Sequence, residues 1–381
     1  MTFSTLTYDA ATDRPQEECG VFGVRGAAEA SVLCAFGLHA LQHRGQEACG
    51  ITSYNQGRFH SERHLGLVGE HFTDPATMKG LAGSMAIGHV RYSTSGAPVL
   101  RNVQPLYADV RGGGVALAHN GNLTNARALR EDLTNGGAIF QSTSDTEVIL
   151  QLAARSKKTK AVDRLVAAFT QVEGAFALVA MTNDKLIGAR DPLGIRPLVM
   201  GELEGAVIFA SETCALDMIG AKFIREVEPG EVVIASDEGI ETRRYAPARP
   251  ARPCAFEYIY FARPDSIIDG VSVYEARKRM GARLAIDSPA DIDVVVPVPD
   301  SGMAAALGYA EQAGKPFDLG IIRSHFVGRT FIQPTQAKRD LGVRRKHSAN
   351  PAVLKGKRVL LIDDSIVRGT TSKKIVRMVR E

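Results

Sequence analysis

Residues 19–26 read CGVFGVRG, an apolar run of strand length that ends at a glycine. Similar runs follow along the chain: GSMAIGHVRY at 83–92, GGVALAHNGNL at 113–123 and GAFALVAMTNDKLIGAR at 174–190. Short apolar runs between glycine and asparagine turns are typical of β-strands, several of which pair as hairpins. The pattern therefore predicts a strand-rich region from Cys19 to about Tyr245.

Three segments inside this region have helical periodicity instead. Their apolar residues recur at intervals of three and four, the spacing of one helix face. The segments are NARALREDLTNGG at 125–137, TEVILQLAARSKK at 146–158 and AVDRLVAAFTQV at 161–172. Strands interrupted by such helices predict sheets that are covered by helices.

A proline-rich segment, APARPARPC, ends this region. Its three prolines resist regular structure, so a linker is predicted at 246–253, between domains at 19–245 and 254–381. The second domain has three apolar runs, each ending in a polar or glycine-rich turn: DIDVVVPVPDSG, KPFDLGIIRS and GKRVLLIDDSIVRGTT. Continuous apolar runs that alternate with helices predict an α/β domain with a parallel sheet.

The composition is that of an ordinary globular protein. The chain has 381 residues, more than one core usually holds, with 45% hydrophobic and 23% charged residues. Its net charge of +4 is too small to indicate nucleic-acid binding. No run approaches the roughly 20 apolar residues of a membrane span, and the first 18 residues do not resemble a signal peptide. We therefore expect a cytoplasmic protein whose five scattered cysteines are reduced.

Cys19 stands at the head of the first apolar run, after a polar segment without helical or strand pattern. Removal of residues 1–18 would give Cys19 a free α-amine, whose pKa near 8 makes it a usable base beside the thiol. One residue would then supply both nucleophile and base. Taken alone, a cysteine beside valine and phenylalanine is more typical of a buried apolar position than of a nucleophile.

Further polar clusters lie at LQHRGQE, GHVRYST, HNGNL and SDTE, where strands end or turns begin. Hydrolysis of glutamine requires a nucleophile, an oxyanion hole, a cation for the α-carboxylate and an anion for the α-ammonium group. Arg91 offers the cation and Asp145 the anion. The side chain of Asn120 and the backbone N–H of Gly121 are suitable oxyanion donors.

In this order, CGVFG and the four clusters resemble the glutaminase domain of the class II, N-terminal-nucleophile amidotransferases. The resemblance implies an α+β sandwich of two antiparallel sheets between helix layers, and a propeptide at 1–18 that is cleaved autocatalytically. It also implies roles for single residues. The catalytic residues are Cys19, Asn120 and Gly121, and the glutamine-binding residues are Arg44, Arg91 and Asp145.

The run VLLIDDSIVRGTTSKK combines a strand, an acidic pair and a short turn that opens a helix. N–H groups of residues 368–371 can converge on a phosphate at the helix N-terminus. Asp363 and Asp364 can accept hydrogen bonds from ribose hydroxyls or hold Mg²⁺. A solvated acidic turn that caps a helix is the simpler alternative.

This run resembles the phosphoribosyl pyrophosphate loop of type I phosphoribosyltransferases, and VPVPDSG resembles their second ligand-binding loop. The resemblance assigns Ser301, Asp363 and Asp364 to Mg²⁺. The residues that it assigns to phosphoribosyl pyrophosphate are Asp363, Asp364, Ser365, Arg368, Gly369, Thr370, Thr371 and Arg329. Arg329 belongs to a basic stretch at 324–348, which we expect to cover the pyrophosphate as a mobile loop. A solvated basic face and nucleic-acid contact are the alternatives for this stretch.

Together with EYIYFARPDS and GRTFIQPTQ, the two domains resemble the amidophosphoribosyltransferase family. Members transfer ammonia from glutamine to 5-phosphoribosyl 1-pyrophosphate, which gives 5-phosphoribosylamine at the first step of purine synthesis. The resemblance implies purine nucleotides as feedback inhibitors and a homo-oligomer, a tetramer, without nucleic acid or membrane as partner. Two alternatives remain: a glutaminase that feeds another acceptor, and a non-enzymatic regulator built on a phosphoribosyltransferase fold.

Two further features compare this chain with members of the family. The sequence ends at VRMVRE, inside the helix after the phosphate loop, so C-terminal truncation relative to the family is expected. Cys254 matches the first ligand of the subgroup with a [4Fe–4S] cluster and a cleaved propeptide, and the remaining ligands would lie beyond residue 381. An ordinary thiol is the alternative for Cys254.

Overall fold

The computed structural model describes residues 19–92, 99–324, 347–366 and 369–381. The predicted propeptide, the basic loop with Arg329, and Arg368 lie outside these residues, as do the side chains of Thr370 and Thr371. The described chain forms two compact units. The first comprises residues up to 257 together with 261–270, and the second comprises 258–260 and 271–381.

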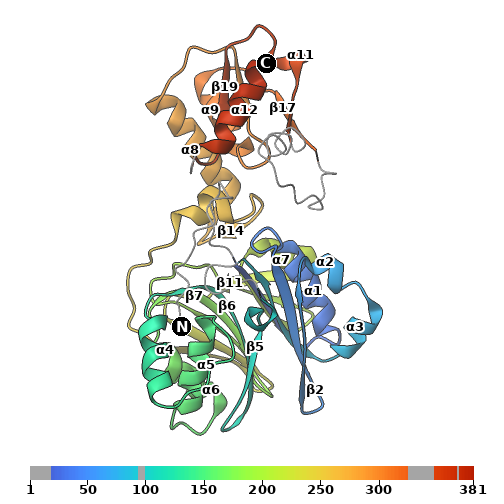
Figure 1. Ribbon diagram of the computed structural model, residues 1–381, viewed down its shortest axis with the longest axis vertical. Helices are drawn as coiled ribbons and strands as arrows, with labels where there is room; N and C mark the ends of the chain where they lie inside the picture. Colours follow the sequence, from blue (N-terminus) through green and yellow to red (C-terminus); the bar gives the residue numbers. More distant parts are fainter. Residues whose placement is uncertain (1–18, 93–98, 325–346, 367–368) are drawn as a thin grey trace, which may run out of the picture. The chain divides into compact units, whose positions relative to one another are not determined.

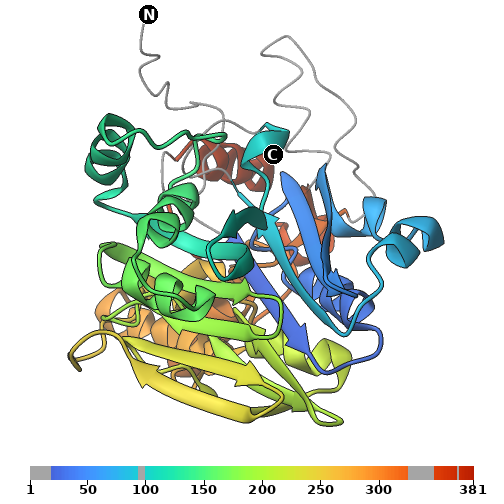
Figure 2. The ribbon, with the colours of Figure 1, turned by 90° about the horizontal axis from the view of Figure 1, so that it is seen from below.

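The first unit contains two antiparallel sheets. The seven-stranded sheet has the order β11(Lys222–Glu226), β9(Val199–Leu203), β10(Ala206–Ala210), β1(Cys19–Arg25), β4(Met85–Arg91), β2(Ala48–Asn55), β3(Arg58–Leu65). The six-stranded sheet has the order β13(Gly239–Arg244), β12(Glu231–Ser236), β8(Leu186–Arg190), β7(Gly174–Met181), β6(Gly113–Leu123), β5(Leu106–Val110). Figures 1 and 2 show the sheets face to face with helices on their outer sides. The predicted sandwich is confirmed.

Helices cover both outer faces of this sandwich (Figure 1). The three predicted helices are α4(Ala126–Asn135), α5(Thr146–Arg155) and α6(Ala161–Phe169), beside the six-stranded sheet. The other sheet is covered by α1(Ala30–Ala40) and α7(Thr213–Ile219), with α2(Val68–His71), α3(Pro75–Gly80) and the 3-10 turn η1(Leu100–Asn102) in connections. The sequence did not predict α1, because the run ASVLCAFGLHA is apolar almost all round and has no clear helix face.

Strand β1 lies at the centre of the seven-stranded sheet, between β10 and β4. Its residues 19–24 are buried, since one face packs under α1 and the other against the second sheet. Gly37 of α1 sets the distance of that helix, because a Cβ there would lie 2.3 Å from the ring of Phe22. The first residue of β1, Cys19, is therefore held inside the sandwich and not at its rim.

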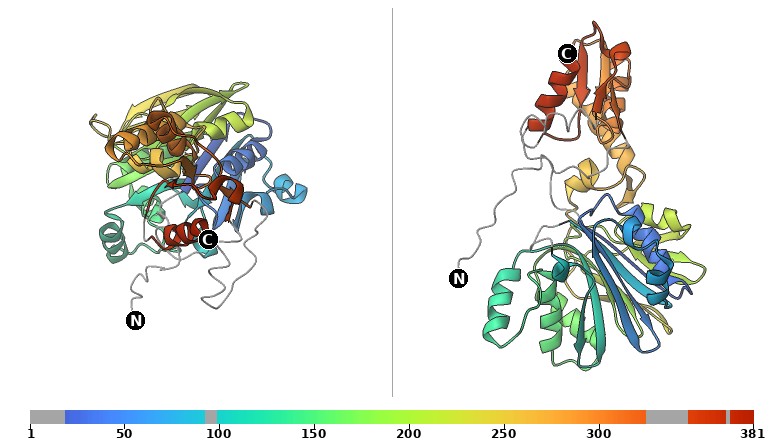
Figure 3. Two further views of the ribbon diagram at one scale, coloured as in Figure 1. Left: turned by 90° about the horizontal axis from the view of Figure 1, so that it is seen from above. Right: turned by 45° about the vertical axis from the view of Figure 1, so that its right-hand side comes forward.

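The second unit is smaller. After the π-helical turn η2(Glu257–Phe261) and strand β14(Ile267–Ile268), it consists of β15(Val271–Ser272), α8(Val273–Asp287), β16(Val294–Pro297), α9(Met303–Ala313), β17(Ile321–Arg323), β18(His347–Ala349), α11(Pro351–Leu354), β19(Val359–Ile362) and α12(Thr370–Arg380). Strands β16 and β19 pair in parallel, which confirms the predicted α/β character. The right-hand view of Figure 3 shows red α12 beside these strands.

One apolar run departs from the predicted parallel sheet. Phe317 makes a parallel bridge to Val295, but the later residues of the run form β17, which pairs antiparallel with β18. Gly320 lies against both side-chain methyls of Val296, so the chain passes close to β16 before it turns away. Apolarity alone predicts that a strand is buried but not which neighbour it pairs with.

Helices α8 and α9 cross in direct backbone contact. A Cβ on Gly281 would lie 1.8 Å from the carbonyl oxygen of Ala305, and a Cβ on Gly308 would lie 1.9 Å from that of Lys278. The two glycines therefore permit a crossing that no larger residue allows.

The residues predicted as a linker pack on the first unit. The backbone N–H groups of Arg252 and Cys254 donate to the carbonyl oxygens of Leu193, at 2.7 Å, and Ile195, at 3.2 Å. Along the chain the change from one compact unit to the other falls between residues 257 and 271. In the part of the chain that is described, no helix has the length and apolarity needed to cross a membrane.

Candidate active site

Antiparallel pairing brings the predicted nucleophile and the predicted cation together. In the register of β1 with β4, Cys19 is the direct partner of Arg91. Both residues are buried, and the Cys19 Sγ lies 3.5 Å from the carbonyl oxygen of Tyr92. The pKa of Arg91 is lowered by burial, while Cys19, Glu47 and Asp145 oppose that shift through their charges. Arg91 is thus within electrostatic reach of both Cys19 and Asp145.

The predicted oxyanion donors lie on β6, in the facing sheet. His89 of β4 is 3.0 Å from the carbonyl oxygen of His119 through Nε2, so the ends of β4 and β6 are tied together beside Arg91 and Asn120. The Nδ2 atom of Asn120 is buried and has no hydrogen-bond partner among the described residues. Two polar hydrogens are therefore available to a ligand at this point.

Gly121 is required by the backbone of β6. Its φ is +139°, and a Cβ would lie 2.0 Å from the carbonyl oxygen of Ala175 on β7. Any other residue would be strained and would clash. The glycine that the sequence proposed as a backbone donor is thus also a structural necessity.

Asp145, the predicted anion, is buried at the start of α5. Its Oδ2 accepts a 2.9 Å hydrogen bond from the backbone N–H of Leu123, and its Oδ1 lies 3.9 Å from Nδ1 of His119. Burial lowers the pKa of His119, although Asp145 opposes the shift. Asp145 is therefore anchored to β6 directly after the predicted oxyanion residues.

Several residues that brace this site were not found from the sequence. Glu147 accepts hydrogen bonds from the backbone N–H groups of Gln141 and Ser142 at 2.8 and 2.7 Å. Asn102 exchanges two hydrogen bonds of 2.9 Å with Thr143. Glu147 belongs to the SDTE motif, but two of its three donors are backbone N–H groups, which no pattern of residue types reveals. These contacts fix the loop that presents Asp145.

Arg44 is placed differently from the other predicted glutamine-binding residues. Its guanidinium is fully buried, and its Nε donates a 2.7 Å hydrogen bond to the carbonyl oxygen of Cys19. Its Nη1 donates to Glu212 at 2.6 Å, and its Nη2 donates to Glu257 at 2.8 Å. The structure thus surrounds Arg44 with protein acceptors. Glu212 and Glu257 were also missed by the sequence, because they stand far along the chain.

The environment of the Cys19 thiol disfavours its ionised form. Burial raises the pKa of Cys19 to about 11, although the hydrogen bond to Tyr92 and the charges of Arg91, Arg196 and Arg44 oppose the shift. At neutral pH the thiol is therefore protonated. A nearby amine that accepts the proton would make the sulfur nucleophilic.

The second cluster of predicted residues lies in the second unit, at the carboxyl ends of β16 and β19. The pairing continues one residue beyond β16, since the backbone N–H of Val298 donates to the carbonyl oxygen of Ile362 at 2.8 Å. A Cβ on Gly302 would lie 2.3 Å from the same carbonyl oxygen. Gly302 therefore lets the loop with Ser301 pass directly against the loop that starts at Asp363.

The acidic loop has a defined local geometry. The backbone N–H of Asp364 donates to Asp363 at 2.9 Å, and the Ser365 hydroxyl donates to Asp364 at 2.8 Å. Gly369 has a φ of +71° and precedes the first turn of α12, where the N–H groups point out of the helix. Carboxylate and hydroxyl oxygens next to a helix N-terminus suit a sugar phosphate and its cation.

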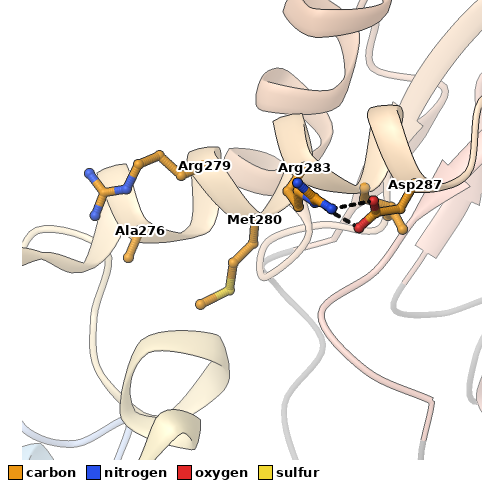
Figure 4. Close-up of a pocket in the computed structure, with 6 residues that line it drawn as sticks. Ala276, Arg279, Met280, Arg283 and Asp287 are labelled. Atoms are coloured by element: carbon orange, nitrogen blue, oxygen red, sulfur yellow. Dashed lines mark hydrogen bonds and ion pairs between the residues drawn. The ribbon is translucent and has the colours of Figure 1, made fainter.

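Figure 4 shows a separate hollow of about 470 Å³ along one side of α8. Its lining residues are Ala276, Arg279, Met280, Arg283, Leu284 and Asp287. Arg283 donates to Asp287 at 2.9 Å, about one turn further along the helix. None of the predicted site residues lines this hollow.

The comparisons with known proteins identify the family. Residues 89–218 match a model described as a glutamine amidotransferase domain. The amidophosphoribosyltransferase of Rhizobium etli is 60% identical over 97% of this chain and 75% of its own length, and that of Bacillus subtilis is 50% identical over 96% and 77%. The chain belongs to the amidophosphoribosyltransferase family. The resemblance drawn from the sequence motifs is confirmed.

A solved amidophosphoribosyltransferase from B. subtilis, in complex with ADP and GMP, has a TM-score of 0.90 to this chain. It is 48% identical, and the match covers 95% of this chain and 79% of that protein. Amidophosphoribosyltransferases use glutamine and phosphoribosyl pyrophosphate for the first step of purine biosynthesis. The family match therefore decides between the alternatives that the sequence left open: the chain is a transferase of this class, not a glutaminase for another acceptor or a non-enzymatic regulator.

Proposed function

We propose that the first unit performs the glutaminase half of the reaction with Cys19 as nucleophile. The sulfur attacks the side-chain carbonyl carbon of glutamine, and the resulting oxyanion accepts hydrogen bonds from Asn120 Nδ2 and Gly121 N–H. The α-amine of Cys19 passes the proton taken from the thiol to the leaving nitrogen, and collapse of the intermediate then expels ammonia and leaves a thioester. Water then hydrolyses the thioester to glutamate and the free thiol.

The buried Asn120 Nδ2, which has no hydrogen-bond partner in the described part of the chain, is the observation that best supports this assignment. An unpaired buried amide is unfavourable in the absence of a ligand, but it is pre-organised to stabilise charge that develops in a transition state. Arg91 and Asp145 would hold the α-carboxylate and α-ammonium groups of glutamine. Their opposite charges match those groups. Strand pairing fixes the backbone of Arg91, and the hydrogen bond from Leu123 fixes the side chain of Asp145.

Removal of residues 1–18 is part of the proposal. It would expose the α-amine of Cys19, which would accept the thiol proton. Because burial raises the pKa of this thiol, a base on the same residue would assist by accepting the thiol proton as the sulfur attacks.

The second unit would bind phosphoribosyl pyrophosphate. Asp363 and Asp364 would hold the ribose, and Ser365, Gly369 and the threonines after it would bind the 5-phosphate at the N-terminus of α12. Ammonia would then attack C1 of the sugar, with pyrophosphate as leaving group. Arg368 and Arg329, predicted ligands outside the described residues, would complete the site.

Mg²⁺ fits the donors present in this loop pair. Ser301, Asp363 and Asp364 offer hard oxygen ligands, and Mg²⁺ in nucleotide and sugar-phosphate sites typically uses one or two carboxylates together with substrate oxygens. When bound, the ion would neutralise charge on the pyrophosphate. In the described residues no group of three or more His, Cys, Asp or Glu side chains is arranged to hold a metal by itself.

The lack of a metal-binding group of His, Cys, Asp or Glu in the described residues also concerns the predicted [4Fe–4S] cluster. Of the five cysteines, Cys254 is the partly exposed one, and the other four are buried. The described residues therefore do not supply a four-cysteine set, and the proposal of a cluster rests on Cys254 and the sequence resemblance.

Purine nucleotides are proposed as inhibitors because the B. subtilis relative binds ADP and GMP. A homotetramer remains a prediction from the sequence.

Two variants test the assignment of glutamine hydrolysis to the first unit and of the synthetic reaction to the second. Cys19→Ala should abolish glutamine-dependent formation of phosphoribosylamine but retain the activity with free ammonia. Asp363→Asn should lose both synthetic activities. Both are measured as pyrophosphate release with saturating glutamine or with ammonium chloride. Glutamine-dependent turnover by Cys19→Ala would overturn the proposed nucleophile.

A further inference from the structure

A network of charged side chains lies buried behind Cys19 in the first unit. Arg44, Glu212 and Glu257 have 0%, 0% and 1% of their side chains exposed. Arg44 bridges the two carboxylates, with Glu257 accepting from both Nη atoms at 2.9 and 2.8 Å. Arg196 adds a second guanidinium, 3.2 Å from Glu257. Two positive and two negative charges thus neutralise one another without solvent.

Each carboxylate is held from several sides. Glu212 accepts from the Ser266 hydroxyl at 2.6 Å and from the backbone N–H of Arg263 at 2.9 Å, and it lies 2.7 Å from Nε2 of His43. Burial opposes its ionisation, yet His43 and Arg44 hold the pKa of Glu212 below its usual range. Glu212 is therefore a carboxylate at neutral pH.

The network reaches the nucleophile through the backbone. The third nitrogen of Arg44, Nε, donates to the carbonyl oxygen of Cys19 at 2.7 Å. Two residues later, the N–H of Val21 donates to the Ser211 hydroxyl at 2.9 Å, directly before Glu212 in the chain. The first residues of β1 are thus fastened to the segment 211–212 on the side away from β4.

Buried ion pairs contribute little net stability, because desolvation of the charges offsets their attraction. Their rigid geometry nevertheless fixes the positions of the groups that they bind. A bidentate carboxylate locks a guanidinium in one plane, and a locked guanidinium fixes the acceptor of its third donor. Here that acceptor belongs to the residue whose sulfur must meet a carbonyl carbon within a few tenths of an ångström.

We propose that Glu212 and Glu257 are positioning residues for the glutaminase half-reaction, which act by locking Arg44 onto the carbonyl oxygen of Cys19. The inference rests on the proposed role of Cys19 as nucleophile. It gives Arg44 a role in orienting Cys19, in place of the glutamine-binding role predicted from the HRGQ motif. Glu257, from the EYIYFARPDS motif, acquires a role that the sequence did not assign.

The test uses the full chain with Glu257→Gln, which keeps the side-chain shape but removes the charge. We expect kcat with glutamine to fall by about 10²-fold, the effect of a displacement near 1 Å, while KM for glutamine changes less than about twofold. Activity with free ammonia should be unchanged. Arg44→Lys, which cannot bind Glu257 in bidentate form, should behave in the same way.

Glu231→Gln is a matched control. Glu231 is buried in the same unit and accepts two 2.8 Å hydrogen bonds from Arg225, but it has no contact with Cys19. Its glutamine-dependent kcat should stay within about twofold of the parent chain. Comparable melting temperatures for Glu257→Gln and Glu231→Gln would exclude general destabilisation as the cause of any difference in their kcat.

Alkylation of Cys19 by iodoacetamide as a function of pH provides a second readout. In Glu257→Gln a negative charge that neutralises Arg44 and Arg196 is lost. The positive charges of these two arginines should then lower the pKa of the Cys19 thiol, so that alkylation begins at a lower pH. A more ionised but catalytically slower cysteine is the signature of lost positioning. A rise in KM with unchanged kcat, or no kinetic change, would overturn the inference. Failure of the nucleophile assignment would appear separately, as glutamine turnover by Cys19→Ala.

Discussion

His89 Nε2 lies 3.0 Å from the carbonyl oxygen of His119, and this hydrogen bond joins the two sheets of the sandwich next to the candidate glutaminase site. Both residues are buried, and burial lowers the pKa of His89 to about 3, with the charge of Arg91 adding to the shift. His89 is therefore neutral at pH 7 and donates from Nε2.

This histidine makes stability depend on pH. The folded-state pKa lies below the unfolded value of about 6.5, so the unfolded chain binds the proton first and stability is lost as pH falls below about 6.5. By pH 5 the loss from His89 is about 2 kcal/mol of the free energy of unfolding. His89→Gln should be less sensitive to acid over pH 7 to 5 in urea unfolding. Parallel pH profiles for the two chains would contradict this prediction.

Asn120→Ala removes the proposed side-chain donor of the oxyanion hole. Because the interaction forms in the transition state, kcat with glutamine should fall by about 10²- to 10³-fold with little change in KM. Activity with ammonia is the internal control and should persist. An unaffected kcat would show that Asn120 does not stabilise the oxyanion.

Arg91→Lys and Asp145→Asn test the recognition of glutamine. Each weakens a charge-assisted hydrogen bond to the substrate, so KM for glutamine should rise by about 10- to 100-fold. Because Asp145 also accepts from Leu123 N–H, its amide variant should also lower the melting temperature. Isothermal titration of glutamine into each variant in a Cys19→Ala background would measure binding without turnover. An affinity for glutamine equal to that of the parent chain would show that the substituted residue does not bind the substrate.

Gly308→Ala tests the crossing of α8 and α9. The added methyl would meet the carbonyl of Lys278 at 1.9 Å, so the second unit should lose about 1–3 kcal/mol of stability. Gly281→Ala should have a similar effect. Gly69→Ala, on α2 with open space around the added atom, should be neutral or slightly stabilising. Denaturant unfolding compares the three, and equal stability of all would contradict the close crossing.

The sequence by itself predicted what depends on local pattern. Periodicity identified α4, α5 and α6, and apolar runs between turns identified β1, β4, β6 and the parallel pair β16 and β19. Motifs in a fixed order identified the family, because reacting groups need particular side chains at particular turns. Gly121 is an example, since the motif predicts a glycine at a position where a φ of +139° also requires one.

Only the tertiary structure decided how distant residues combine. Arg44 was recognised as part of a motif, but its partners Glu212 and Glu257 stand 168 and 213 residues away. A buried guanidinium binds whichever acceptors the fold brings to it, and sequence spacing does not encode that choice. The antiparallel partner of β17 and the backbone contact at Gly281 have the same origin. Strand register and helix crossing are settled by packing over the whole unit, because burial and hydrogen bonding must be satisfied together.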